Sequence, residues 1–240
     1  MAQLLALPSV CVSVAPADGP SVRHWLKSHL PYPLVCAIAR ATNRPWLGAE
    51  HRTERLVEYA WVLRHLVPGR ILDYGYAGSY FAEALCQFGT VLGVDPRETP
   101  PICHPNFIYW SVDLWEGTHT GRELRFDTIV CVSVLEHYLP FTDTVCRLRA
   151  QLAPGGVLLV TVPVGPPQRF KGYRTITEEE LAPLGGVIRY RVKTPQGWLP
   201  SSAFPDVRST EHETRALGLL RLPGPPRVVG ADPSLGSGPR

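Results

Sequence analysis

The chemistry that this sequence could perform begins with an acidic residue at the end of an apolar run. Ile71-Leu72-Asp73 is followed by the loop Gly75–Ser79, which consists mostly of small residues. Small residues let the backbone approach a ligand closely, and a helix that starts after the loop offers N–H groups without partners. The loop lacks the glycine order of a dinucleotide site and the Gly-Lys-Ser/Thr of a phosphate-binding loop. The carboxylate of Asp73 therefore favours a cationic or hydroxyl-bearing ligand.

Further polar residues follow the later apolar runs. Asp95 ends the second run, Asp113 comes shortly after the third, and Glu136 and His137 follow the fourth. One carboxylate can accept hydrogen bonds from both hydroxyls of a ribose. An imidazole titrates near neutrality, so it can accept a proton without an extreme pKa shift. Carboxylates at these positions can accept hydrogen bonds from the hydroxyls of a ligand, and an imidazole there can act as a general base.

The elements that must position these residues are short apolar runs alternating with helical segments. The runs are apolar throughout, as expected of parallel strands that are covered on both faces. Strands interleaved with helices imply right-handed crossovers and an open, doubly wound α/β sheet. The predicted strands are Arg70–Tyr74, Val91–Asp95, Asn106–Trp110, Phe126–Val134 and Val157–Val162. The predicted helices are Ala49–Leu66, Tyr80–Phe88 and Thr142–Leu152, with a turn at Pro154-Gly155-Gly156.

The first of these helices is amphipathic. Its apolar residues recur at helical spacing from Leu56 to Leu66, and Arg55, Glu58 and Arg64 lie elsewhere on the helical wheel. Pro68-Gly69 then ends the helix. This pattern predicts that the apolar side faces the core and that the charged residues lie away from it.

In this order, the motifs resemble those of the class I S-adenosylmethionine-dependent methyltransferases. The first motif of that family has the form acidic-x-Gly-x-Gly-x-Gly, which Asp73 and Gly75 match, whereas Ala77 and Ser79 replace the two later glycines. Each of these replacements carries a Cβ, so a loop that needs positive φ there would be strained. The similarity spans roughly Ala49 to Val164. It implies a Rossmann-like, mostly parallel sheet of seven strands with helices on both faces, preceded by a partly helical N-terminal extension.

The resemblance also implies a cofactor and roles for individual residues. It assigns Asp95 to the ribose of S-adenosylmethionine and Asp113 to the adenine amino group. It makes His137 the candidate base and Glu136 its neighbour, although adjacent helical residues point in different directions, so we expect one of the two to be structural. The predicted cofactor-binding residues are Asp73, Tyr74, Gly75, Tyr76, Ala77, Asp95, Pro96, Asp113, Leu114 and Ser133.

Each of these residues also has a structural interpretation. Asp73 could cap the following helix, and Asp95 could be a turn residue before Pro96. Glu136 and His137 could simply begin the next helix, where a Glu suits the positive end of the dipole. The two tyrosines of the first motif could fill the core with satisfied hydroxyls.

The predicted function is methyl transfer to a small-molecule or glycan acceptor, with no nucleic acid or membrane partner. The alternative is a methyltransferase-like binding or scaffolding protein without turnover, which the replacements at Ala77 and Ser79 favour. A nicotinamide oxidoreductase is disfavoured because its glycine order is absent. We also expect activity without a metal, because Ser133 stands where relatives with a Glu-x-x-Glu-His pattern have their first Glu, and hard cations prefer several oxygen ligands.

The segment after Pro163 follows the fifth strand, where strand ends open onto a ligand crevice. The loop Val164–Tyr173 could face an acceptor with its basic and aromatic residues, or it could be a solvated connection. Thr177 and Glu180 form a predicted capping box. The remaining predicted strands are Gly186–Val192 and Ala216–Leu222, and Trp198 with residues 200–210 could cover the crevice.

The composition limits the number of domains and the classes of protein to which the chain can belong. The chain has 240 residues, a net charge of +3 and 45% hydrophobic residues, which suits one packed domain with appendages and does not by itself indicate nucleic-acid binding. We expect an extension at 1–48 with a helix near Ser21–His29, a methyltransferase-like domain at 49–222, and a disordered Pro- and Gly-rich tail at 223–240. The six scattered cysteines predict reduced thiols, and no Lys or Arg precedes the apolar stretch Leu4–Val14, so we expect the cytoplasm rather than secretion.

Overall fold

The computed structural model describes residues 54–76, 79, 81–95, 104–110, 124–137, 140–195, 197–210 and 213–226. Four of the predicted cofactor residues, Ala77, Pro96, Asp113 and Leu114, lie outside the described residues. So do the predicted N-terminal extension and most of the predicted tail. Within the described part of the chain, no helix has the length and apolar character to cross a membrane.

One mixed sheet forms the centre of the fold, and its eight strands lie in the order β3-β2-β1-β4-β5-β8-β6-β7. Neighbours from β3 to β5 pair in parallel, and those from β5 to β7 pair antiparallel. This confirms the doubly wound α/β prediction. The strands are β1 (Gly69–Tyr74), β2 (Gly89–Val94), β3 (Phe107–Trp110), β4 (Phe126–Val132), β5 (Leu152–Pro163), β6 (Val187–Thr194), β7 (Gly197–Ser201) and β8 (Ala216–Pro223).

The predicted count of seven strands was wrong because the segment around Trp198 is a strand rather than a covering loop. β7 forms a hairpin with β6, in which Lys193 is opposite Trp198. The Thr194 hydroxyl donates to the carbonyl oxygen of Gly197 at 2.9 Å, and Gly197 has a φ of +112°. Only glycine adopts such a φ without strain, so this residue permits the tight reversal.

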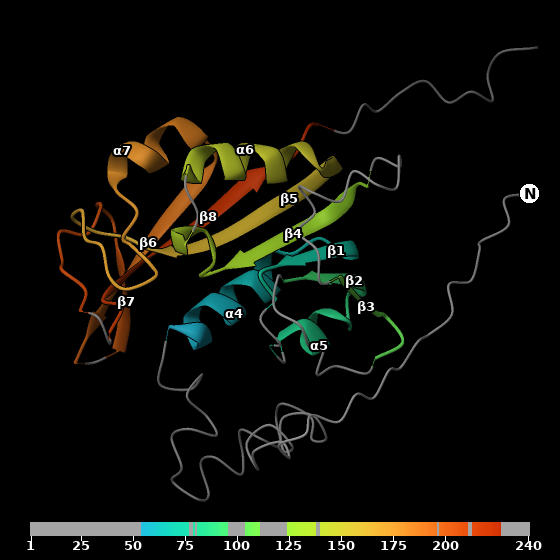
Figure 1. Cartoon of the computed structure of the whole chain (residues 1–240), viewed down its shortest axis with the longest axis horizontal. Coiled ribbons are helices and arrows are strands. Elements are labelled where there is room, and N and C mark those ends of the chain that lie inside the picture. Colours follow the sequence, from blue (N-terminus) through green and yellow to red (C-terminus); the bar gives the residue numbers. More distant parts are fainter. Residues whose placement is uncertain are drawn as a thin grey trace, which may run out of the picture.

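Helices cover both faces of the sheet (Figure 1). The helices α4 (Arg55–His65) and α5 (Phe81–Leu85) pack on one face, and α6 (Phe141–Ala150) and α7 (Glu178–Leu181) pack on the other. Successive strand residues point to opposite faces. Ile71 therefore joins the core under α4, and Leu72 joins the core under α6. This is why the strands are apolar throughout rather than alternating.

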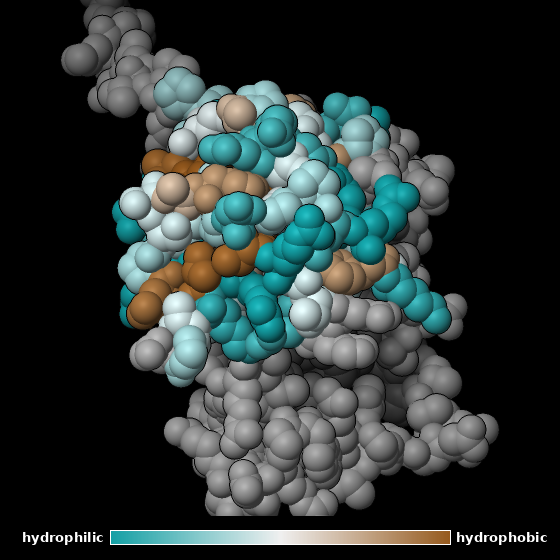
Figure 2. Space-filling model, turned by 90° about the vertical axis from the view of Figure 1, so that its left-hand side faces the viewer, coloured by the Kyte–Doolittle hydropathy of each residue, from teal (hydrophilic) through white to brown (hydrophobic). Residues whose placement is uncertain are grey.

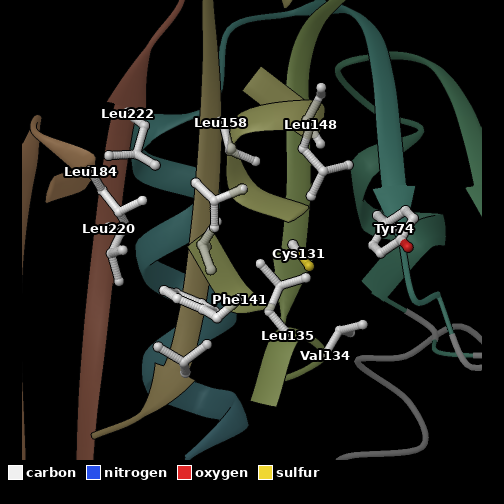
Figure 3. Packing of buried hydrophobic residues seen from close by; sticks show 14 of the residues in the cluster. Tyr74, Cys131, Val134, Leu135, Phe141, Leu148, Leu158, Leu184, Leu220 and Leu222 are labelled. Carbon is white, nitrogen blue, oxygen red and sulfur yellow. The ribbon is translucent and has the colours of Figure 1, made fainter. Parts of the chain in front are cut away.

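The core on the α6 side joins the parallel and antiparallel halves of the sheet. Phe141 and Leu148 of α6 pack there with Leu158 of β5 and with Leu220 and Leu222 of β8 (Figure 3). All five side chains are almost completely buried. The antiparallel strands are therefore part of the same folding unit as the parallel ones.

The turn predicted at Pro154-Gly155-Gly156 lies inside the long strand β5. Gly155 has a φ of +77°, and the register against β4 shifts between Phe126 and Thr128. The Gly155 N–H donates to the carbonyl oxygen of Pro225 at 2.7 Å, and the N–H of Gly224 donates to that of Gly156 at 2.8 Å. The chain after β8 thus pairs back onto this irregular start of β5, as far as the described residues reach.

Candidate active site

The loop after β1 is held between two other strand ends. The N–H of Gly75 donates to the carbonyl oxygen of Val94 at 2.8 Å, and that of Tyr76 donates to the same oxygen at 3.3 Å. Gly75 has a φ of +78°, and a Cβ there would come within 2.3 Å of Val134, which follows β4. The position therefore requires glycine both for its φ and for the close approach. These contacts bring the carboxyl ends of β1, β2 and β4 to one site.

Two buried carboxylates lie at neighbouring strand ends in this site. Asp73, in β1, is 5% exposed, and Asp95, just after β2, is 3% exposed. Burial raises the pKa of Asp73 to about 7, and the charge of Asp95 adds to the rise. The Oδ2 atom of Asp73 has no hydrogen-bond partner among the described residues. A buried acceptor without a donor is costly, so the site suits a ligand that brings a donor or a positive charge.

Both tyrosines of the loop motif lie in the core. Tyr74 packs in the α6-side core, and the Tyr76 ring packs against Phe107 and Tyr109, with ring centroids 5.0 and 5.9 Å apart. The Tyr76 hydroxyl is buried without a partner among the described residues, and burial raises its pKa. These tyrosines were expected either to shape the cofactor pocket or to fill the core with satisfied hydroxyls. The Tyr76 ring fills the core, but its hydroxyl is not satisfied there.

Ser79, which replaces a family glycine, has a structural role. Its hydroxyl oxygen accepts a hydrogen bond from the Phe81 N–H at 3.1 Å and lies 3.1 Å from the Tyr59 hydroxyl. The Tyr59 and Phe81 rings stack with centroids 4.1 Å apart. Through these contacts Ser79 joins α4 to α5.

The loop after β4 depends on a carboxylate from the first helix. Ser133 has a φ of +48°, and its hydroxyl donates to Oε1 of Glu58 at 2.7 Å. The Thr161 hydroxyl of β5 donates to the same oxygen at 2.6 Å. The Arg55 guanidinium pairs with Oε2 of Glu58, also at 2.6 Å. Glu58 therefore ties α4 to the ends of β4 and β5.

The helical pattern of α4 predicted that Glu58 lies away from the core, and this prediction was wrong. Glu58 is fully buried, as the acceptor of the three groups just described. The helical period assigns a charged residue to the outside because burial of an unpaired charge is costly. The one local signal was Arg55, three residues earlier on the same helix, which forms the ion pair. The hydroxyl partners are distant in sequence. The predicted cofactor residue Ser133 thus uses its hydroxyl within the protein.

Glu136 and His137 point to different surroundings, although they are adjacent. Glu136 is 6% exposed, and its Oε2 has no partner among the described residues. Burial raises the Glu136 pKa to about 8, and the charge of Glu58 contributes to the rise. His137 is exposed, and its Nδ1 contacts the carbonyl oxygen of Gly172. Because a carbonyl oxygen only accepts, Nδ1 carries the proton in this contact and Nε2 of the neutral ring is left as an acceptor.

The segment after β5 is an ordered hairpin rather than an irregular connection. The N–H of Phe170 donates to the carbonyl oxygen of Tyr173 at 2.8 Å, and their rings stack at 4.7 Å. The Gln168 amide donates to the Ser209 carbonyl oxygen at 3.1 Å and accepts from the Ser209 N–H at 2.9 Å. The Tyr173 hydroxyl donates to the Thr210 carbonyl oxygen. Figure 2 shows the end of the molecule that carries these loops, where hydrophilic residues surround separate hydrophobic groups.

The base of this hairpin continues into the predicted capping box, which is confirmed. α7 starts after Thr177, and the N–H of Thr177 donates to Oε2 of Glu180 at 3.1 Å. The same carboxylate accepts two hydrogen bonds from the Arg174 guanidinium, at 2.7 and 2.8 Å. Glu180 therefore fixes the start of α7 and the return strand of the hairpin together.

Solved structures of methyltransferases are similar to this chain. A structure of 1,6-didemethyltoxoflavin-N1-methyltransferase from Burkholderia thailandensis is similar with a TM-score of 0.54 and 19% identity, covering 88% of this chain and 94% of that one. A structure of an S-adenosylmethionine-dependent methyltransferase from Archaeoglobus fulgidus gives a TM-score of 0.49 and 14% identity, covering 74% and 99%. No protein with a curated description matches the sequence.

The sheet order, with the first motif at the end of β1, defines the class as the α/β methyltransferase fold. The sequence profile of the family described as methyltransferase domain matches residues 46–194, which is more than half of the chain. The chain belongs to this methyltransferase family. The resemblance to S-adenosylmethionine-dependent methyltransferases and the predicted Rossmann-like fold are thereby confirmed.

We predict that Glu58→Ala lowers the free energy of unfolding by about 3–5 kcal/mol, because two hydroxyls and a guanidinium lose their acceptor. Glu58→Gln keeps an acceptor oxygen for Ser133 and Thr161 but loses the ion pair with Arg55, so its loss should be smaller. Denaturation in urea measures both changes. Asp143→Ala, at an exposed position in the first turn of α6, is the control and should change stability by about 1 kcal/mol or less. Equal effects of Glu58→Ala and Asp143→Ala would contradict the role of Glu58.

The raised pKa of Asp73 predicts a pH dependence of stability. Between the ordinary value of 3.8 and about 7, the folded protein binds more protons than the unfolded chain, so this carboxyl destabilises the fold increasingly as the pH rises. Asp73→Asn should therefore gain up to about 4 kcal/mol relative to the wild type between pH 4 and 7. Equilibrium unfolding of the two ligand-free proteins at a series of pH values measures this difference. A difference that is constant over the range would show that Asp73 titrates normally.

Proposed function

We propose that this protein binds S-adenosylmethionine at the carboxyl ends of β1 and β2 and transfers its methyl group to a small-molecule or glycan acceptor. The observation that carries the proposal is the pair of buried carboxylates, Asp73 and Asp95, at adjacent strand ends. Oδ2 of Asp73 has no partner among the described residues, and burial together with the charge of Asp95 raises the pKa of this carboxyl to about 7. Binding of a positively charged ligand would offset this cost.

The two carboxylates of the site fit this cofactor. Asp73 would pair with a positively charged part of the cofactor, and Asp95 would accept from the two ribose hydroxyls. Gly75 tolerates no side chain because a Cβ there would meet Val134, and this keeps the loop after β1 close to the end of β4. When bound, the cofactor supplies a methyl group that is already activated by a sulfonium. The roles of Ala77, Pro96, Asp113 and Leu114 remain predictions from the family resemblance.

One similar structure supports a small acceptor. The Burkholderia thailandensis structure contains S-adenosylhomocysteine together with 1,6-didemethyltoxoflavin. In the present chain, the hairpin that follows β5 extends beside the site and carries Phe170, Lys171 and Tyr173 at its tip. Aromatic and basic side chains of this kind suit a sugar or another polar ring.

The cytoplasm stays the expected compartment of the protein.

The protein's task in this reaction is to align the acceptor and to take its proton. Alignment of two reactants accounts for much of the barrier reduction when the transferred group is already activated. The contact with Gly172 fixes the ring of His137, with Nε2 as the nitrogen that accepts a proton. His137 therefore acts as general base for a hydroxyl or protonated amine acceptor. Glu136 is buried, and its Oε2 has no partner among the described residues, so it stays the second candidate for the base.

We predict that Asp95→Ala weakens S-adenosylmethionine binding by roughly 1.5–3 kcal/mol through the loss of charge-assisted hydrogen bonds. Isothermal titration calorimetry of the folded variant measures the change. The exposed control Asp143→Ala should bind as the wild type does. Unchanged affinity in Asp95→Ala would remove the ribose assignment.

We also predict that His137→Ala lowers turnover by about 10²-fold or more while leaving cofactor affinity nearly intact. His137→Gln is the informative partner, because its amide can still donate to the carbonyl oxygen of Gly172 but cannot act as a base. Formation of S-adenosylhomocysteine over a library of hydroxyl and amine acceptors measures turnover from pH 6 to 9.

Equal losses of turnover in the two His137 variants support the base role. Recovery of turnover in His137→Gln would show that His137 only positions the hairpin through its contact with Gly172. If the wild type binds S-adenosylmethionine but forms no product with any acceptor in the library, the alternative of a non-catalytic binding protein is favoured instead.

A further inference from the structure

A second concave site lies at the end of the sheet opposite the candidate active site. It is a pocket of about 340 Å³ between the last turn of α4, the start of β6 and the end of β8. α4 ends just before β1 begins, and β8 runs antiparallel to β5, so these elements meet at the amino ends of the parallel strands. The lining residues are Trp61, Arg64, His65, Leu66, Val67, Val187, Arg189, Leu219 and Arg221.

The pocket collects positive charge from three separate elements. Arg64 comes from α4, Arg189 from β6 and Arg221 from β8. Leu219 is opposite Arg189 in the sheet and belongs to the core under α4, which places both strand arginines on the α4 face. None of the three has an ion-pair partner among the described residues, and no acidic residue is part of the lining. Like charges gathered in this way create a positive potential that attracts an anion.

The inner wall of the pocket adds a donor and an apolar surface. Trp61 is 8% exposed, and its Nε1 is a buried donor with no acceptor among the described residues. Nδ1 of His65 donates to the Trp61 carbonyl oxygen at 2.7 Å, and the two rings are in contact. Leu219 is buried behind the pocket, and Val187 is 50% exposed at its edge. The pocket thus has a cationic rim, and its inner wall is largely apolar.

We propose that this pocket binds an organic phosphate, in the form of a phosphate monoester with an apolar body. Guanidinium groups bind phosphate oxygens through paired hydrogen bonds. The three arginines carry three positive charges, which is more than a single carboxylate can neutralise. A phosphate monoester carries nearly two negative charges at neutral pH and offers three acceptor oxygens. Its apolar body packs on Val187, which is half exposed at the edge of the pocket, and on the accessible part of Trp61. The site is separate from the proposed methyl-transfer site and takes a different class of ligand.

Calorimetric titration of the full chain at constant ionic strength tests the proposal, with phenyl phosphate as the probe and inorganic phosphate and benzoate for comparison. We expect saturable binding that is tightest for phenyl phosphate. The Trp61 indole N–H resonance, assigned by its absence in Trp61→Phe, should move with the same saturation curve. The titration needs neither S-adenosylmethionine nor an acceptor, so its result is independent of the proposed function.

Two variants locate the site. Arg189→Gln and Arg221→Gln should each weaken phenyl phosphate binding by at least about tenfold, because each removes a charged hydrogen-bond donor. Arg70→Gln, which removes the same charge from an exposed position outside the pocket, should leave it unchanged. Absence of saturable binding, an equal loss in Arg70→Gln, or tighter binding of benzoate or inorganic phosphate would overturn the proposal.

Discussion

The buried carboxylate of Glu58 is the interaction on which the arrangement of the site depends. It accepts hydrogen bonds from the hydroxyls of Ser133 and Thr161 and pairs with Arg55, so it joins α4 to the ends of β4 and β5. A buried charge is tolerated only when its partners are in place, which means that these elements must assemble together. The positive φ of Ser133 is held by this network. The loop that carries Glu136 and His137 therefore begins at a residue whose backbone conformation is fixed.

The buried carboxylates near the carboxyl ends of the parallel strands differ in whether their oxygens have partners. Glu58 has partners for both oxygens. Asp73 and Glu136 each have one oxygen without a partner among the described residues, and burial raises the pKa of both. Asp73 faces the strand end that the proposed cofactor would occupy, so a cation can relieve it there. A site whose polar groups are satisfied only by the ligand discriminates strongly against ligands that lack the matching groups.

Fold prediction succeeded where a local pattern decided the structure. The apolar runs predicted β1 to β5, because a strand covered on both faces is apolar throughout. β6 and β8 were predicted from the family resemblance. The capping box at Thr177 and Glu180 was read correctly because its partners are three residues apart. The strand β7 was missed because its pairing depends on the turn at Gly197 rather than on its own hydrophobicity. The turn predicted at Gly155 became part of β5 because β8 and the residues after it pair with this segment.

The sequence by itself determined the class of fold, the acidic residues at the ends of β1 and β2, and the family to which the chain belongs. These properties depend on the order of short motifs, and each motif is read within a few residues. The tertiary structure decided which polar groups are buried, which of them have partners, and where charges gather. Glu58 is buried and hydrogen-bonded only because segments distant in sequence contact it. The three pocket arginines likewise lie together only through contacts between distant segments. Such contacts follow from packing of the whole chain, which local periodicity does not encode.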